Sequence, residues 1–341
     1  GESQATANYD IDTIEPTVVS VAIGDASIIS GETPTVTVVL SEANTGFTKD
    51  DVVCATGALG ALSTGDGLTY TGTFTPTTNT EDNSNTCVVG TSWTDSAGNA
   101  PEAGLTSSNY AIDTQAPTSS VTGISDTSLI EGDTAVITIV LSEANSGFTN
   151  ADVTCANAAV GALSTSDGLT YSGTMTPDAE VEDTSNTCVV GTSWTDTAGN
   201  AGTTFTSSNY LIDGVDPTVS SISLADTTII KSQTVVVTIV ISEANTGFTN
   251  ADVTCDNGAV GSLSTGDGLT YTGTFTPSAN VEDNSNTCTV GTGYFDSAGN
   301  GADTAGISAN YEVETLAPTS SVTGISDTSL IEGDTAVITI V

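Results

Sequence analysis

The chain has 341 residues, of which 42 are Asp or Glu and 2 are Lys or Arg, so its formal net charge is −40. Binding to nucleic acid is excluded, because phosphates require a basic face that two basic residues cannot form. The charge also disfavours anionic membranes and favours divalent cations at carboxylate clusters. Aromatic residues make up only 5% of the chain, so the core must rest on Val, Ile, Leu and Thr. The apolar runs have the length of strands, and none is long enough to span a membrane.

One segment occurs four times, at intervals of about 100 residues. Its copies are Tyr9–Thr17, Tyr110–Thr118, Tyr210–Thr218 and Tyr311–Thr319. Each copy is typical of a last strand, an acidic joint and the start of the next strand, with a proline that fixes φ at the joint. We therefore expect three tandem modules at residues 13–113, 114–213 and 214–314. Residues 1–12 would be the last strand of a preceding module and residues 315–341 the first strands of a following one, as in a piece of a longer array.

Within the second module, strand patterns alternate with turn patterns, and no helical period is present. The expected strands, in chain order, are Thr118–Ile124, Thr134–Leu141, Asp152–Cys155, Ala159–Leu163, Leu169–Thr176, Asn186–Thr195 and Ser207–Ile212. Thr134–Leu141 is apolar on both faces, which predicts a central position in its sheet. Seven short strands in about 100 residues is the count of an immunoglobulin-like sandwich. The predicted fold class is all-β: tandem seven-stranded immunoglobulin-like β-sandwiches in a linear array.

The six cysteines come as one pair per module with constant spacing: Cys54 and Cys87, Cys155 and Cys188, Cys255 and Cys288. This even count favours three disulfides and an oxidising, extracellular environment, and the alternative is free buried thiols. Zinc is disfavoured, because the chain has no histidine to complete a two-thiolate site. By strand order the two cysteines lie on the third and sixth strands, which predicts a staple between neighbouring strands of one sheet.

Four patterns carry a resemblance to a known family: Ile-Asp-Thr-x-Ala-Pro-Thr, Ser-Glu-Ala-Asn-x-Gly-Phe-Thr-x-x-Asp-Val, Thr-Tyr-x-Gly-Thr-x-Thr-Pro and Asp-x-Ala-Gly-Asn. With them the chain resembles the bacterial immunoglobulin-like repeats of giant secreted adhesins and biofilm matrix proteins. The resemblance covers the whole chain. It implies an extracellular stalk, secreted or attached to the cell surface, and calcium bound at the joints between modules. The near-absence of lysine and the cysteine pairs depart from the family pattern.

Three sets of recurring acids and amides are the candidate calcium ligands. They are the joint residues Asp12, Asp113, Asp213 and Glu314; the pairs Asp95 and Asn99, Asp196 and Asn200, Asp296 and Asn300 before the last strand; and Asp25, Asp126, Asp226 and Asp327 after the first strand. A joint that offers two or three carboxylates, with carbonyls and water, suits a weak extracellular calcium site. The alternative is that Asp and Asn are present only as turn formers. The loops that carry these residues need not all lie at one end of a sandwich.

The recurring Glu42, Glu143 and Glu243 could in principle serve glycosidase chemistry, which uses two carboxylates. Identical acids in every module and the absence of histidine argue against an enzyme, so no catalytic residue is expected. The expected function is a structural stalk or matrix fibre. Its expected partners are neighbouring modules of a longer chain and identical chains in a filament. The alternative is an array that binds a sugar or a host protein, although the loops are nearly copied between modules. Trp93 and Trp194 could stack on a sugar, or fill the core.

Overall fold

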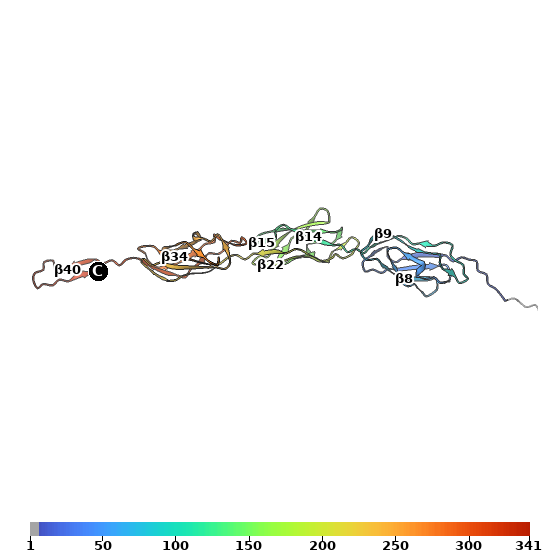
Figure 1. The fold of residues 1–341 in the computed structure, drawn as a ribbon, viewed down its shortest axis with the longest axis horizontal. Coiled ribbons are helices and arrows are strands. Elements are labelled where there is room, and N and C mark those ends of the chain that lie inside the picture. Colours follow the sequence, from blue (N-terminus) through green and yellow to red (C-terminus); the bar gives the residue numbers. More distant parts are fainter. Residues whose placement is uncertain (1–6) are drawn as a thin grey trace, which may run out of the picture. The chain divides into compact units, whose positions relative to one another are not determined.

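The computed structural model describes residues 7–341, and the chain divides into two compact units. The first unit takes the chain up to Thr127, Thr134–Thr176 and Asn186–Asn209; the second takes Ser128–Asp133, Pro177–Ser185 and Tyr210–Val341. We call strands β1–β13 module 1, β14–β26 module 2 and β27–β39 module 3 (Figure 1). The helical elements of the described residues are three 3-10 helices, η1 (Lys49–Asp51), η2 (Asn150–Asp152) and η3 (Asn250–Asp252). No helix of this part of the chain could cross a bilayer.

Module 1 has a first sheet in the order β1-β3-β8-β6, with β7 also paired to β8. Its strands are β1 (Val18–Ile23), β3 (Thr35–Leu40), β6 (Gly57–Leu59), β7 (Ser63–Thr64) and β8 (Thr69–Pro76). The opposite layer consists of β12-β10-β5, β2-β13-β9 and β11-β4. These strands are β2 (Ser27–Ile29), β4 (Asn44–Thr45), β5 (Val52–Cys54), β9 (Glu81–Asn85), β10 (Cys87–Val89), β11 (Thr94–Asp95), β12 (Leu105–Thr106) and β13 (Tyr110–Asp113).

Module 3 repeats this topology within the second unit. Its first sheet contains β27 (Val219–Leu224), β29 (Val235–Ile241), β32 (Gly258–Val260), β33 (Ser264–Thr265) and β34 (Thr270–Pro277). The other strands are β28 (Thr228–Ile230), β30 (Asn245–Thr246), β31 (Val253–Cys255), β35 (Glu282–Asn286), β36 (Cys288–Val290), β37 (Phe295–Asp296), β38 (Gly306–Ile307) and β39 (Tyr311–Glu314). After it, β40 (Val322–Ile325) and β41 (Ile338–Ile340) form an antiparallel pair.

The strands of module 2 are shared between the two units. The first unit contains β14 (Ser119–Ile124), β16 (Ala135–Leu141), β17 (Asn145–Ser146), β18 (Val153–Cys155), β19 (Ala158–Val160), β20 (Ser164–Thr165), β21 (Thr170–Pro177), β23 (Cys188–Val190), β24 (Thr195–Asp196) and β25 (Phe205–Thr206). A second sheet is formed by β15 (Ser128–Ile130), β26 (Tyr210–Asp213) and β22 (Glu182–Asn186).

Alternating apolar residues build the core of each sandwich. In module 1, Val36 and Val38 of β3 and Phe74 of β8 are fully buried beneath the first sheet. Phe47 contacts Trp93 edge-on, with ring centroids 5.4 Å apart, and the Trp93 indole N–H donates to Gly90 O at 3.1 Å. Trp93 and Trp194 are 1% and 0% exposed, so both tryptophans are core residues and neither is a sugar platform.

Each module has one disulfide, between directly paired residues of two antiparallel strands. Cys54 of β5 faces Cys87 of β10, and Cys155 faces Cys188 in the same register. Cys255 and Cys288 form the third bond. This is the staple between neighbouring strands that the sequence predicts. In the chain-entropy description, closing a loop of this length stabilises a module by roughly 3–4 kcal/mol.

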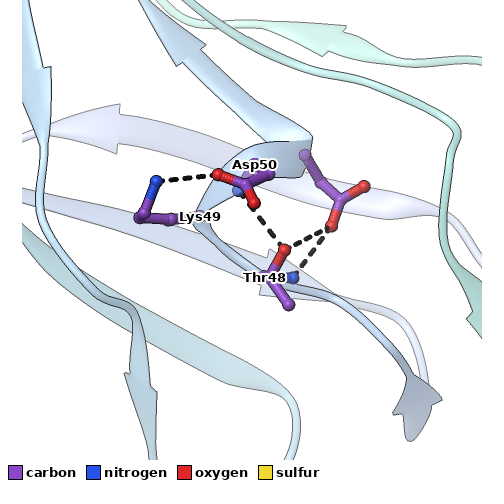
Figure 2. A network of polar contacts seen from close by, with 4 residues as sticks. Thr48, Lys49 and Asp50 are labelled. Atoms are coloured by element: carbon purple, nitrogen blue, oxygen red, sulfur yellow. Dashed lines mark hydrogen bonds and ion pairs between the residues drawn. The ribbon is translucent and has the colours of Figure 1, made fainter.

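A capping box fixes the turn that leads into the first cysteine strand. The Thr48 hydroxyl accepts from Asp50 N, and the Asp51 carboxylate accepts from Thr48 N at 2.9 Å (Figure 2). Lys49 donates to Asp50 at 2.7 Å in an exposed ion pair. Such a surface pair stabilises little, so the reciprocal Thr48 and Asp51 bonds hold this turn.

The all-β, tandem immunoglobulin-like fold predicted from the sequence is confirmed, and several details differ. The strand at Thr134–Leu141 is central, between β14 and β21, but Val136 on its outer face is 48% exposed, so only one face is buried. The expected strand Asn186–Thr195 is split, because Asn186 ends β22 and Cys188 begins β23 in another sheet. The strand expected at Leu169–Thr176 is β21, which begins and ends one residue later, at Thr170 and Pro177.

The sequence patterns also missed short strands. Ser27–Ile29 and its equivalents run parallel to the last strand of the same module, and three residues are too few for a visible alternation. The strand expected at residues 1–12 lies partly outside the described residues, and residues 7–12 form no strand. The equivalent strands β13, β26 and β39 each lie between two partner strands, and Tyr9–Asp12 has no such partners.

Candidate cation site at the joints between modules

Three carboxylates come together at three of the four joints, those of Asp12, Asp113 and Asp213. The second group contains Asp113 at the end of β13, Glu143 in the turn after β16 and Asp196 in β24, and one carboxylate oxygen from each lies within 4.8 Å of the others. We call these groups the acidic triads. The other two are Asp12, Glu42 and Asp95, and Asp213, Glu243 and Asp296. The first two triads lie in the first unit and the third lies in the second.

The antiparallel pairing of the first two long strands explains why Glu143 reaches the joint. Ser142 N donates to Thr118 O at 2.9 Å, so the turn after β16 lies beside the residue at which the chain leaves the joint. Glu143 follows directly in this turn and is partly exposed. Glu42, Glu143 and Glu243 recur in the sequence, but the pattern alone does not predict that they lie at the joint.

The third member of each triad is almost completely buried. Asp196 is 1% exposed, and its Oδ1 accepts from Gly199 N at 2.6 Å and Asn200 N at 2.8 Å. Its Oδ2 accepts from the Asn200 side-chain amide at 2.8 Å. Gly199 has φ +118, a value that glycine adopts readily and other residues adopt rarely. The loop Asp196–Asn200 thus holds a carboxylate in a fixed place.

In module 1 the same contacts act on Asp95. Burial on its own raises the pKa of this carboxyl, but hydrogen bonds from the Asn99 amide and from the backbone of Asn99, Gly98 and Ala97 outweigh it. The pKa of Asp95 is therefore lowered, and the buried side chain is a carboxylate at neutral pH.

The asparagine of the same loop connects one module to the preceding one. The Asn200 Oδ1 accepts from Ser30 N at 2.8 Å, and its amide nitrogen donates to Asp113 O at 3.0 Å. Asn300 makes the equivalent contacts, with Glu131 N at 3.2 Å and Asp213 O at 2.8 Å. In module 1, Asn99 donates to Asp12 O at 3.3 Å. The side-chain oxygens of Asn200 and Asn300 are thus already engaged with the backbone of the preceding module.

In the second and third triads, the acids repel one another and no basic residue of the chain compensates them. Burial, followed by repulsion from Asp196 and Asp113, raises the pKa of Glu143. The pKa of Glu243 is raised by burial and by Asp296 and Asp213. The pKa of Asp213 is raised by burial, with Asp296 next. The two basic residues of the chain, Lys49 and Lys231, are not among the groups that act on these carboxyls. A cation would relieve this repulsion.

The remaining candidate ligands occupy other places. Asp25, Asp226 and Asp327 each accept a hydrogen bond from the backbone N–H two residues later, as Asx turns do. Asp126 follows β14 at the equivalent position. These four are not members of the acidic triads. Glu314 ends β39 as Asp113 ends β13, and it is exposed.

A family model described as a bacterial Ig-like domain matches residues 12–112, 113–212 and 213–313. No curated protein matches the chain. Among solved structures, the Escherichia coli adhesin FdeC is 13% identical, with 90% of this chain and 99% of that chain covered and a TM-score of 0.34. Titin domains I67–I69 are 11% identical, with coverages of 89% and 99% and a TM-score of 0.43. The S-layer protein rSbsC is 12% identical, with coverages of 96% and 63% and a TM-score of 0.21.

Proposed function

Because the chain belongs to the bacterial Ig-like domain family, which matches it in three tandem repeats, we propose that it is an extracellular stalk or matrix fibre whose joints bind calcium. The observation that carries the proposal is the acidic triad, which recurs with the same residue positions at the joints of Asp12, Asp113 and Asp213. The three disulfides support a location in an oxidising, extracellular environment.

The residues of the triads fit calcium. Calcium prefers six to eight oxygen ligands at about 2.3–2.6 Å, so two oxygens on one ion are at most about 5.2 Å apart. The 4.8 Å limit within each triad satisfies this condition. Asp113, Glu143 and Asp196 would hold the ion, and backbone carbonyls and water would complete its shell. When bound, the ion supplies positive charge between three carboxylates that otherwise repel each other.

The candidate ligands of the second triad come from two modules, so a bound ion would affect the stiffness of the joint. Asp113 ends the last strand of module 1, whereas Glu143 and Asp196 belong to module 2. An ion held by all three would tie the two modules together, in addition to the Asn200 hydrogen bonds. Restricting the joint in this way would stiffen the array, and mutual repulsion along an acidic chain would keep it extended and soluble.

The test uses the whole chain in EDTA, in about 10 mM calcium, and in sodium chloride of matched ionic strength. We expect calcium to raise the unfolding temperature and to lengthen the particle measured by small-angle X-ray scattering, with little effect of sodium. No calcium-specific change in either quantity would refute the calcium-bound joint. Stabilisation without lengthening would retain the cation site and refute the stiffening.

A further inference from the structure

The residue that follows the joint acid is locked to the preceding module at two joints. Thr114 is 4% exposed, and its hydroxyl donates to Thr77 O at 2.7 Å. The same hydroxyl accepts from Thr80 N at 3.1 Å, and the backbone N–H of Thr114 donates to Thr80 O at 2.8 Å. Thr315, at the last joint, makes the equivalent two side-chain bonds. Each hydroxyl thus fixes the chain to a loop of the module it leaves, which in module 1 is the loop between β8 and β9.

At the joint between modules 2 and 3, a glycine takes the place of this threonine. Gly214 keeps the backbone bond, from its N–H to Val181 O at 2.7 Å, but it has no hydroxyl to make the other two. A Cβ at Gly214 would meet no atom closer than 3.4 Å, and Gly214 is not among the residues with a positive φ. Neither the space nor the backbone conformation therefore requires a glycine here. The glycine leaves the chain with more conformational freedom than a threonine would.

A second tie, between the proline of the joint and the module that follows, also differs. We call the joint between modules 1 and 2 the Asp113 joint and that between modules 2 and 3 the Asp213 joint. At the Asp113 joint, Thr203 donates to Pro117 O from its backbone N–H at 3.0 Å and from its hydroxyl at 3.3 Å. The equivalent residues at the Asp213 joint are Asp303 and Pro217, and no hydrogen bond joins them in the described part of the chain. A carboxylate cannot replace the hydroxyl as a donor.

Acids replace neutral residues around the Asp213 joint. The positions that Ser30, Ala116 and Thr203 hold at the Asp113 joint are taken there by Glu131, Asp216 and Asp303. These three acids line one pocket of about 410 Å³. Burial, followed by repulsion from Asp303, raises the pKa of Asp216. Like charges from module 2, the linker and module 3 thus surround a hollow at this joint, where the Asp113 joint has small neutral side chains.

We infer that the Asp213 joint is a hinge of the array and that the Asp113 joint is its stiffer connection. The inference rests on the proposed role as a structural array, and it names the joint at which such an array bends. Two ties that restrict the Asp113 joint are missing from the Asp213 joint, and like charges oppose close contact there. Asn300 of module 3 still bonds Glu131 N and Asp213 O of module 2, so the two modules stay in contact at this pivot. Hinges commonly lie in a few loop residues, small ones among them.

Pulsed electron double resonance between two spin labels, on the whole chain in EDTA, measures the flexibility of each joint. The label pair across the Asp113 joint is Thr73→Cys with Thr174→Cys, and the pair across the Asp213 joint is Thr174→Cys with Thr274→Cys. These threonines are exposed and hold equivalent positions, and the native cysteines are all in disulfides, so only the introduced thiols react. We expect the distance distribution across the Asp213 joint to be at least about twice as broad as that across the Asp113 joint.

Exchanging residues between the joints tests whether they set this difference. The variant Gly214→Thr, Asp216→Ala and Asp303→Thr gives the Asp213 joint the residues of the Asp113 joint, and it should narrow the distribution across the Asp213 joint to the width found at the other. The matched reverse variant, Thr114→Gly, Ala116→Asp and Thr203→Asp, should broaden the distribution across the Asp113 joint. Circular dichroism and the unfolding temperature establish that both variants fold.

Equal widths at the two joints of the labelled chain would overturn the hinge. Unequal widths that neither exchange variant alters would also overturn the inference, because the exchanged residues would then not set the flexibility. EDTA removes divalent cations, so either result leaves the calcium-bound joint untouched. A repeat in calcium is a separate measurement: widths that do not respond to calcium would count against the calcium-stiffened joint and leave the hinge untouched.

Discussion

The substitution Glu143→Gln separates the repulsion within a triad from its use in binding a cation. Glutamine keeps the size of the side chain and removes one of three charges whose oxygens lie within 4.8 Å of each other. Without calcium the variant should be more stable than the wild type, because the pKa of Glu143 is raised by burial and by its acidic neighbours. With calcium the variant should gain less stability, because one ligand charge is missing.

The magnitudes can be worked from the geometry. Two unit charges 4.8 Å apart repel by about 0.9 kcal/mol in bulk water and by about 3.5 kcal/mol at an effective dielectric constant of 20. Glu143 and Asp113 are partly exposed, so we expect a gain of about 1–2 kcal/mol in EDTA. An extracellular site with a dissociation constant of about 0.1–1 mM would stabilise the wild type by about 1.4–2.7 kcal/mol at 10 mM calcium.

Urea unfolding, followed by tryptophan fluorescence, measures this difference in module 2. Trp93 and Trp194 are the only tryptophans, and a tyrosine occupies the equivalent place in module 3 as Tyr294. Trp93→Tyr therefore leaves Trp194 as the single reporter, in the same module as Glu143. The control is Glu102→Gln, which removes one charge from an exposed position outside the triads.

Two outcomes would refute this reasoning. If Glu143→Gln destabilised the chain in EDTA, the triad would not be repulsive and the raised pKa would have another origin. An undiminished calcium response in the variant would mean that Glu143 is not a ligand. The pH dependence gives a further test: a raised folded-state pKa means that wild-type stability increases as the pH falls toward the ordinary glutamate value, and the variant should lose this part of the profile.

Four further predictions concern single features of the modules. Asn200→Ala removes the side chain that forms hydrogen bonds with Ser30 and Asp113, so it should cost about 1–3 kcal/mol of stability in urea unfolding. It should also loosen the joint, as measured by X-ray scattering. The control Asn150→Ala, at an exposed site, should change neither the stability nor the scattering. Backbone N–H groups of Thr170 and Leu169 lower the pKa of Asp167 to about 2, so the stability that this carboxylate contributes is present above about pH 4 and is lost toward pH 2. Asp167→Asn should therefore reduce the dependence of the unfolding free energy on pH over that window, and an unchanged pH profile would contradict this. Replacing Cys155 and Cys188 by alanine should cost about 2–5 kcal/mol in urea unfolding of module 2, and a reductant should destabilise module 2 in the wild type but not in this variant, whose other two disulfides lie in modules 1 and 3. A Cβ at Gly57 would lie 2.2 Å from Phe74, so Gly57→Ala should cost about 1–3 kcal/mol of stability. Adding Phe74→Met should recover part of that loss. Additive effects in the double variant would rule out the proposed contact.

The sequence predicted the features that depend on local pattern and on counting. The repeat, the strand alternation and the cysteine spacing were sufficient for tandem immunoglobulin-like modules with one cross-strand disulfide each. The joint aspartate and the loop aspartate, Asp113 and Asp196, were candidates from the sequence, and the structure brings them together. Short strands such as Ser27–Ile29 were missed, because their pairing is long-range and three residues carry no period.

To predict that Glu143 belongs to the triad, the strand topology is needed in addition to the sequence pattern. The first two long strands are antiparallel, so the turn after the second must return to the joint, and this places Glu143 beside Asp113. The same reasoning separates Asp126, which lies at the other end of the first strand, from the joint. The role of Asn200 was not visible in the sequence, because its partner Ser30 lies 170 residues away in the chain.

Core residues and triad residues vary differently between the modules. Where module 1 has Gly57 against Phe74, module 2 has Ala158 in the place of the glycine and Met175 in the place of the ring. A Cβ at Gly202 would lie 2.3 Å from the Trp194 ring, and module 3 combines Ala302 with the smaller Tyr294. Between modules 1 and 2 for the first pair, and between modules 2 and 3 for the second, a larger residue at one position accompanies a smaller one at the other, as close packing demands. The triads instead keep three carboxylates in every copy, and in the second and third triads burial and the neighbouring acids raise the pKa of Glu143 and Glu243. Packing alone does not explain this repulsion, which the proposed cation would relieve.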